Sequence, residues 1–245
     1  MAAVLTLLTA GEAGAKCKTD GIRVFPAPGA VIPLNSQMVL EGYGVEQARV
    51  LALVGQELVL KAPDDVVTVK VLPGWKSSEK RVAVLLKPSH PLRPDKQYSL
   101  LVDRLLPNYV ILNDSSADTL FWRTGAEADE KAPRYKLKPS ITEGVYKTDG
   151  EQVTRLLKIH TTLTEESPAY LVVTLRRSRN ATGSQTYFVP LEGGEGVIGT
   201  DGCTGNFTLE DGRAYKATAE AFDSTGRAAG ALPAIELHAP KPTRQ

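Results

Sequence analysis

The stretch that decides the fold is PLRPDKQYSLLV, residues 91–102, and its pattern returns in TLEDGRAYKATA, residues 208–219. In each stretch a leucine stands six residues before a tyrosine, and a turn-forming pair lies between them. The tyrosine then opens a run in which every second residue is apolar. Such alternation is typical of a half-buried strand that follows a turn.

This spacing predicts a tyrosine corner in each half of the chain, formed by Leu92 with Tyr98 and by Leu209 with Tyr215. A chain that crosses between two sheets leaves backbone groups without sheet partners at the bend. A tyrosine just after the bend can bury its ring and direct its hydroxyl group to that backbone. A chance tyrosine at a strand start is the alternative, since tyrosine favours strands. The repetition at one spacing, once in each half, favours the corner.

The rest of the chain has the same period of two, as in VVTVKVL (residues 66–72) and AYLVVTLRR (residues 169–177), with turn-forming clusters between the runs. Many short strands with regular turns are typical of sandwiches and barrels. The polar, acidic stretch at residues 126–134 has the composition of a linker. The sequence therefore predicts an all-β protein with two tandem immunoglobulin-like β-sandwich domains, at residues 16–125 and 135–240.

With these features in hand, the chain resembles bacterial Ig-like and fibronectin type III-like modules. The first half carries the resemblance in FPAPGAVIPLNSQMVLEGYG (residues 25–44), in its tyrosine corner and in FWRTG (residues 121–125). The second half resembles the same superfamily more loosely, through AFDSTGR (residues 221–227). The resemblance implies a fold and an exported setting in the cell envelope, but no particular chemistry.

The N-terminal stretch MAAVLTLLTAGEAGA, residues 1–15, is predicted to be a signal peptide. An apolar run is followed by Ala13-Gly14-Ala15, which fits an A-x-A cleavage site. The alternative is a short helix or strand, because no lysine or arginine precedes the apolar run. Export would place the protein in the periplasm or on the cell surface.

The two cysteines, Cys17 and Cys203, are candidates for a disulfide in an oxidising compartment. In a linear tandem of domains they would lie about one domain length apart, whereas a disulfide needs a Cα separation below about 7 Å. A bond between them therefore requires that the domains fold side by side, or that a long N-terminal arm reaches across.

Charge and hydropathy exclude two classes of partner. The chain has 29 lysine and arginine residues against 28 aspartate and glutamate residues, a net charge of +1. This balance gives no overall field to hold nucleic acid or an anionic membrane. We also expect no membrane span, because no apolar run reaches the length of about 18 residues that a spanning helix needs.

Patterns that would indicate catalysis, a metal or a cofactor are weak. The histidines His90, His160 and His238 are far apart and share no predicted strand face. GEGVIG, residues 194–199, matches the Gly-x-Gly-x-x-Gly pattern of dinucleotide sites, but no helical sequence follows it. A glycine-rich hairpin loop explains it better. We therefore expect a non-enzymatic protein without catalytic residues, metal or cofactor.

Five residues are candidates for recognition: Trp75, Tyr109, Arg176, Arg177 and Arg179. Trp75 lies in a predicted turn and either stacks on a sugar or a partner, or folds back on its own domain. The three arginines either grip phosphate or sulfate groups or form a solvated hairpin tip. Tyr109 is a weaker candidate for the role of Trp75, a ring that stacks on a sugar or a partner. The alternative is that Tyr109 packs in the core.

These observations leave three hypotheses for function. The first is a structural spacer and protein-interaction module of the envelope, with exposed edge strands as contact sites. The second is a carbohydrate-binding or adhesive module that uses Trp75. The third and least favoured is a hydrolase, since no nucleophile and base pair is visible. The expected partner is an envelope protein or a polysaccharide, whose identity the sequence does not give.

Overall fold

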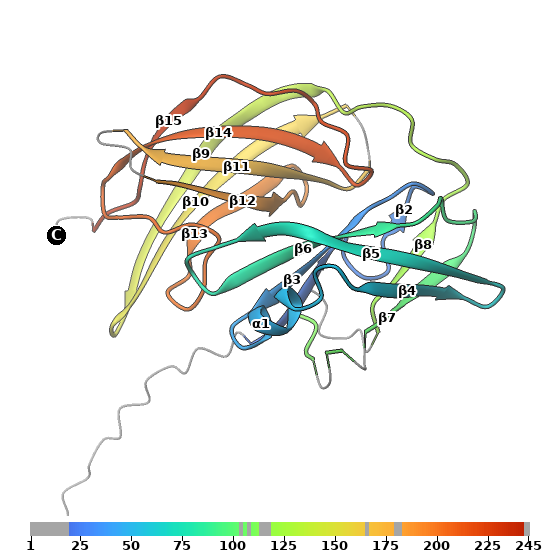
Figure 1. The fold of residues 1–245 in the computed structure, drawn as a ribbon. Coiled ribbons are helices and arrows are strands. Elements are labelled where there is room, and N and C mark those ends of the chain that lie inside the picture. Colours follow the sequence, from blue (N-terminus) through green and yellow to red (C-terminus); the bar gives the residue numbers. More distant parts are fainter. Residues whose placement is uncertain are drawn as a thin grey trace, which may run out of the picture.

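The computed structural model describes residues 20–102, 105–106, 109–112, 119–164, 167–178 and 183–242. These residues form an all-β protein with three sheets and one short helix, α1 (Glu46–Leu51). The first half (residues 20–125) and the second half (residues 135–242) lie side by side (Figure 1). Within the described part of the chain, no helix is long and apolar enough to cross a membrane.

The first half forms a single eight-stranded sheet in the order β1-β3-β6-β5-β4-β7-β8-β2. All neighbouring strands are antiparallel except β2 and β8, which are parallel. The strands are β1 (Gly21–Phe25), β2 (Val31–Ile32), β3 (Met38–Tyr43), β4 (Glu57–Ala62), β5 (Asp65–Lys76), β6 (Arg81–Pro88), β7 (Gln97–Leu101) and β8 (Phe121–Thr124).

This sheet curls around one hydrophobic core, to which every strand contributes. Trp122 is fully buried in that core, and its Nε1–H donates to the carbonyl oxygen of Pro26 at 2.8 Å. The sequence predicted a sandwich of two sheets here, and the structure differs. The reason is the pairing of β4, which hydrogen-bonds to β5 along one edge and to β7 along the other and so joins the two expected layers into one sheet.

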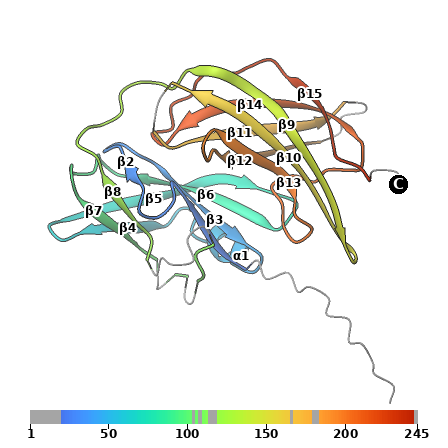
Figure 2. The same cartoon turned by 180° about the vertical axis from the view of Figure 1, so that it is seen from behind.

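The second half contains two sheets that face each other across a core. The three-stranded sheet has the order β13-β10-β9, and the four-stranded sheet has the order β12-β11-β14-β15. The strands are β9 (Tyr135–Asp149), β10 (Gln152–Leu163), β11 (Ala169–Arg177), β12 (Ser184–Pro190), β13 (Glu195–Thr200), β14 (Ala214–Asp223) and β15 (Ile235–His238). Figure 2 shows this pair of sheets from the opposite side.

Each half contains the hydrogen bond of a tyrosine corner. The Tyr98 hydroxyl accepts the backbone N–H of Arg93 at 3.0 Å, and the Tyr215 hydroxyl accepts that of Glu210 at 3.0 Å. In both cases the donor directly follows the buried leucine of the predicted pattern. The hydroxyl thus satisfies a backbone group that the bend leaves without a sheet partner.

The connecting segment, residues 126–134, is fixed to both halves. The Asn35 side chain donates to the carbonyl oxygen of Asp129 at 2.8 Å, and its Oδ1 accepts the Asp129 N–H at 3.0 Å. From the second half, the Ser167 hydroxyl donates to Asp129 Oδ2 at 2.8 Å, and Arg227 forms an ion pair with Glu130. The segment predicted as a linker is therefore held in place by contacts with both halves of the chain.

Candidate functional site

The candidate site lies where the two halves meet. The sheet of the first half has its core on one side and presents Val39, Ala83 and Leu85 on the other. These side chains belong to the same hydrophobic cluster as the core of the second half. Burial of such surface is the main favourable term in association, so the two halves are packed together by a continuous apolar contact.

Aromatic rings form the centre of this contact. Trp75 stacks on Phe188 with ring centroids 5.4 Å apart, and its ring meets Tyr170 edge-on at 6.0 Å. Tyr170 also contacts Phe25 and Phe222, each with a centroid distance of 5.5 Å. The sequence left open whether Trp75 stacks on a ligand or folds back on its own domain. The structure places it against the other half of the chain.

Hydrogen bonds between the halves surround the aromatic cluster. The backbone N–H of Gln37 donates to the Ser224 carbonyl at 2.6 Å. Further hydrogen bonds join the side chains of residues 36–37 to residues 224–225. On another side, the Ser77 hydroxyl donates to the Gly205 carbonyl at 2.6 Å, and the Gly205 N–H donates to the Glu79 carbonyl at 3.0 Å. Because these bonds are directional, they fix the relative orientation of the halves.

A buried carboxylate, that of Glu41, lies between the halves and is only 4% exposed. Its Oε2 accepts the Tyr43 hydroxyl at 2.7 Å, and its Oε1 accepts the Tyr187 hydroxyl of the second half at 2.8 Å. Burial raises the pKa of Glu41, and the charge of Arg81 and the two tyrosine hydroxyls oppose this. Burial also raises the pKa of Tyr187, and the negative charge of Glu41 adds to that rise.

Two arginines accompany this carboxylate. The Cζ atoms of Arg23 and Arg81 lie 5.0 Å and 4.6 Å from the ring centroid of Tyr43, within cation–π distance. Arg81 also donates from Nε and Nη2 to the Thr204 hydroxyl, at 3.2 Å each, which ties it to the second half. Buried ionic groups need such partners to offset the loss of water.

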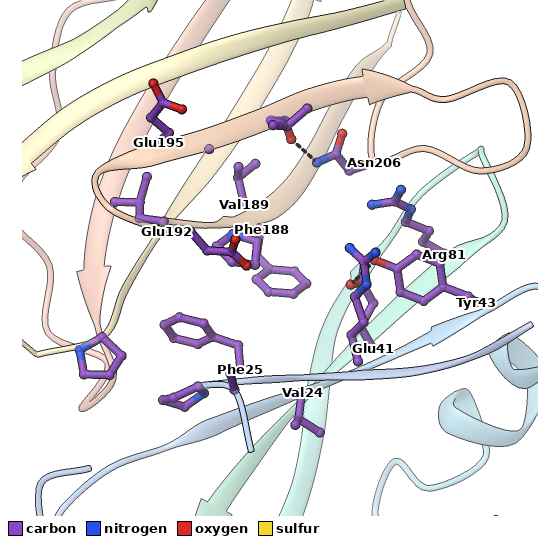
Figure 3. Close-up of a pocket in the computed structure, with 18 of the residues that line it drawn as sticks. Val24, Phe25, Glu41, Tyr43, Arg81, Phe188, Val189, Glu192, Glu195 and Asn206 are labelled. Atoms are coloured by element: carbon purple, nitrogen blue, oxygen red, sulfur yellow. Dashed lines mark hydrogen bonds between the residues drawn. The ribbon is translucent and has the colours of Figure 1, made fainter. Parts of the chain in front are cut away.

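Next to these groups is a cleft of about 670 Å³ between the halves (Figure 3). Glu41, Tyr43 and Arg81 lie together at one end, Glu192 and Glu195 lie at the other, and the rings of Phe25 and Phe188 lie between them. The Asn206 amide also lines the cleft, but it is occupied in holding β13, through bonds to the Val197 carbonyl at 2.8 Å and the Gly199 N–H at 2.9 Å.

The cleft has an apolar centre with polar and charged groups around it. An apolar centre with a few polar groups around it is typical of ligand sites. The described residues that line the cleft include no serine, threonine, cysteine, histidine or lysine. Elsewhere in the described part of the chain, no three histidine, cysteine, aspartate or glutamate side chains form a group that could hold a metal ion.

The other residues singled out in the sequence do not join this cleft. Tyr109 is half-buried and packs against the core of the first half. Arg177 forms an ion pair with Glu210, and Arg176 is exposed on β11. Arg179 lies outside the described residues. The arginine run thus offers two side chains at the end of β11, one of which already has a carboxylate partner.

The candidate disulfide and signal peptide also fall partly or wholly outside the described residues, which exclude 1–19 and therefore Cys17. Cys203 lies in the loop that follows β13. The two halves do lie side by side, which is one of the two alternative arrangements that would allow a Cys17–Cys203 bond. The bond itself stays a prediction.

Sequence reasoning missed the carboxylate and its partners. Glu41 lies in β3, and all six residues of this strand are buried. The sequence does carry one signal for this site, because Val39 is apolar and so are its neighbours Met38 and Leu40. A strand with apolar residues at both odd and even positions is typically buried on both faces. A glutamate within such a strand needs hydrogen-bonding partners in the interior.

Comparison with solved structures gives distant matches. No protein-family model matches the sequence, and no curated protein matches it significantly. The chain is similar to part of the pullulanase type I from Bacillus subtilis str. 168, solved with maltose, at 13% identity and a TM-score of 0.26, covering 89% of this chain and 24% of that one. It is also similar to the chicken CNTN1 FN1-FN3 domains, at 9% identity and a TM-score of 0.28, covering 91% of this chain and 66% of that one.

This chain therefore spans less than two thirds of the length of either solved chain. TM-scores this low do not establish a shared overall arrangement, and neither match bears on what the chain binds.

Proposed function

We propose that this chain is an exported, non-enzymatic protein of the bacterial cell envelope that acts as a stiff spacer and binds partner proteins. Its first half would be a variant of an Ig-like module, in which β4 joins the two expected layers into one sheet, and its second half an Ig-like or fibronectin type III-like module. The observation that carries the proposal is the single hydrophobic cluster to which both halves contribute, with Trp75 stacked on Phe188 inside it. Contacts between domains of one chain are usually more polar than this, and such domains move relative to one another.

A spacer must hold its two ends at a fixed angle. The bonds of Gln37 and Ser77 across the interface, and the two bonds that Glu41 accepts, favour such a fixed angle. Exposed edge strands remain at the outside of the sheets, and edge strands are natural sites for protein contacts. These features support a role in which the chain positions a partner rather than transforms a substrate.

The proposal is tested with the full chain, tagged at its C-terminus and expressed in a bacterial host. Cell fractionation followed by crosslinking in intact cells should place the chain in the envelope fraction and give a discrete crosslinked product of defined mass. A chain that stays in the cytoplasm, or one that turns over a substrate, would contradict the proposal. The cleft variant Arg23→Ala serves as a control, because it should leave the crosslinked product unchanged.

A carbohydrate-binding role is the second candidate, and the cleft favours it. Sugars bind on apolar surfaces flanked by hydrogen-bonding groups, and the cleft combines Phe25 and Phe188 with the exposed side chains of Arg23 and Glu192. Co-sedimentation with purified cell-wall polysaccharide tests it. An Arg23→Ala, Glu192→Gln variant should lose binding. A Lys61→Ala, Glu57→Gln control on β4, with the same change in charge, should keep it. The absence of binding by the unmodified chain would reject this role.

A further inference from the structure

Strand β9 presents an unusually long free edge. It runs over 15 residues and pairs with β10, its only strand partner within the described part of the chain. Most of its residues are exposed, and Leu137 is 46% exposed although it is apolar. The hairpin of β9 and β10 reaches beyond the four-stranded sheet in both views (Figures 1 and 2). A row of backbone groups without a strand partner is a template for another chain.

A groove runs along this free edge. It has a volume of about 710 Å³ and lies between β9 and the segment that follows β15. Its lining includes seven consecutive residues of β9, 141–147, together with Leu157 of β10. The half-buried side chains of Ile141, Val145 and Tyr146 give it an apolar part. On the far side it is bounded by His238, Pro240 and Lys241.

The charges around the groove are mainly positive. Lys136, Lys138, Lys147 and Lys241 are exposed, and none forms an ion pair with another described residue. Of the two carboxylates on β9, that of Glu143 is paired with Lys158 at 2.6 Å, and Asp149 is the last residue of the strand. The edge therefore has an excess of positive charge next to unsatisfied strand hydrogen-bonding groups and an apolar groove.

We propose that the edge of β9 binds an extended, acidic segment of a partner protein, which adds to the three-stranded sheet as a further strand. The backbone groups of β9 that follow Pro139, a residue without an N–H of its own, would supply the main-chain hydrogen bonds. The groove would accept apolar side chains, and the lysines would pair with carboxylates. A second copy of β9 fits this edge less well, because like charges that face each other across a strand pair are destabilising. This inference rests on the proposed function and names the contact site within it.

The test uses the full chain labelled with ¹⁵N and three synthetic peptides of alternating sequence. The acidic peptide acetyl-(Val-Glu)₄-amide should shift the amide signals of residues 140–149 and slow the hydrogen exchange of those amides that face the free edge. The basic peptide acetyl-(Val-Lys)₄-amide should not bind, because its charge has the wrong sign. The peptide acetyl-(Pro-Glu)₄-amide should not bind either, because it keeps the negative charge but cannot pair as a strand.

Two variants with the same change in charge complete the test. Lys138→Glu with Lys147→Glu should weaken binding of the acidic peptide by about tenfold or more, because two charge pairs reverse their sign. Lys61→Glu with Lys70→Glu, on exposed positions of β4 and β5, should leave the affinity unchanged. Because all four positions are exposed, neither variant is expected to disturb the fold.

Four results would overturn the inference: no binding of the acidic peptide, equal binding of the basic or the proline peptide, signal changes confined to residues outside β9, or no effect of the Lys138 and Lys147 variant. Equal binding of the proline peptide would point to a general affinity for polyanions. If the crosslinked product in cells persists when the peptide test fails, the proposed function stands and the partner binds elsewhere. If the product is also absent, the proposed function fails with it.

Discussion

Replacing Glu41 by alanine should loosen the two halves from each other. The carboxylate accepts the hydroxyls of Tyr43 and Tyr187 at 2.7 Å and 2.8 Å, and all three residues are buried. A hydrogen bond to a charged group contributes about 1.5–3 kcal/mol, and a buried donor left without a partner carries a penalty of its own. Removal of one member of a buried ionic cluster typically costs about 3–5 kcal/mol. We therefore expect the free energy of unfolding to fall by about 3–5 kcal/mol.

The assay is urea unfolding at neutral pH, followed by tryptophan fluorescence and by circular dichroism. Glu57→Ala serves as the matched control, because Glu57 is exposed on β4 and should change the free energy of unfolding by less than about 0.5 kcal/mol. The reasoning is refuted if Glu41→Ala is as stable as the control, since the carboxylate would then not hold the two halves together.

The pH dependence gives a second test of the same group. Burial raises the pKa of Glu41 above its ordinary value of 4.5. The folded chain then binds more protons than the unfolded chain between these two pKa values, so the free energy of unfolding decreases as the pH rises through that range. Glu41→Gln has no proton to lose and should lack this decrease. If the free energies of unfolding of the unmodified chain and of Glu41→Gln differ by a constant amount from pH 4.5 upward, the raised pKa of Glu41 is contradicted.

Four further substitutions test other side chains by urea unfolding. Trp75→Ala should lower the free energy of unfolding by about 3 kcal/mol, because it removes a large ring from between the halves; an unchanged value would mean that the ring contributes nothing to the interface. Tyr98→Phe should cost about 2 kcal/mol and Tyr215→Phe about 1 kcal/mol, since the Tyr98 hydroxyl also donates to Asp65; the reverse order would argue against a stabilising bond to Asp65, and no cost for either would argue against the corner bonds. Arg176→Ala should be neutral within about 0.5 kcal/mol, because the side chain is exposed and forms no ion pair or hydrogen bond with another described residue.

The tyrosine corners and most strands were predictable because their signals are local. The leucine, the turn and the tyrosine of each corner lie within seven consecutive residues, and the period of two follows directly from strand geometry. The single sheet of the first half was not predictable in this way, since a strand has the same period whether one neighbour pairs with it or two. The helix α1 was missed because its six residues are too few to establish a helical period.

The cleft was beyond the reach of the sequence for a different reason. Trp75 was recognised as an unusual residue, but its partners Tyr170 and Phe188 lie in the other half of the chain. Their contact depends on how the halves dock, which no local pattern encodes. Glu41 likewise depends on Tyr187 for its second hydrogen bond. Residues whose partners lie in distant segments of the chain therefore could not be identified as site residues from the sequence.

The most direct test of the central claim, that the two halves form one stiff frame, is ¹⁵N relaxation of backbone amides in the full chain. If the halves are docked as described, amides of both halves should fit one rotational diffusion tensor, with a correlation time expected for a rigid 26.4 kDa particle. If the halves instead give two separate and shorter correlation times, they tumble independently, and the stiff frame is contradicted.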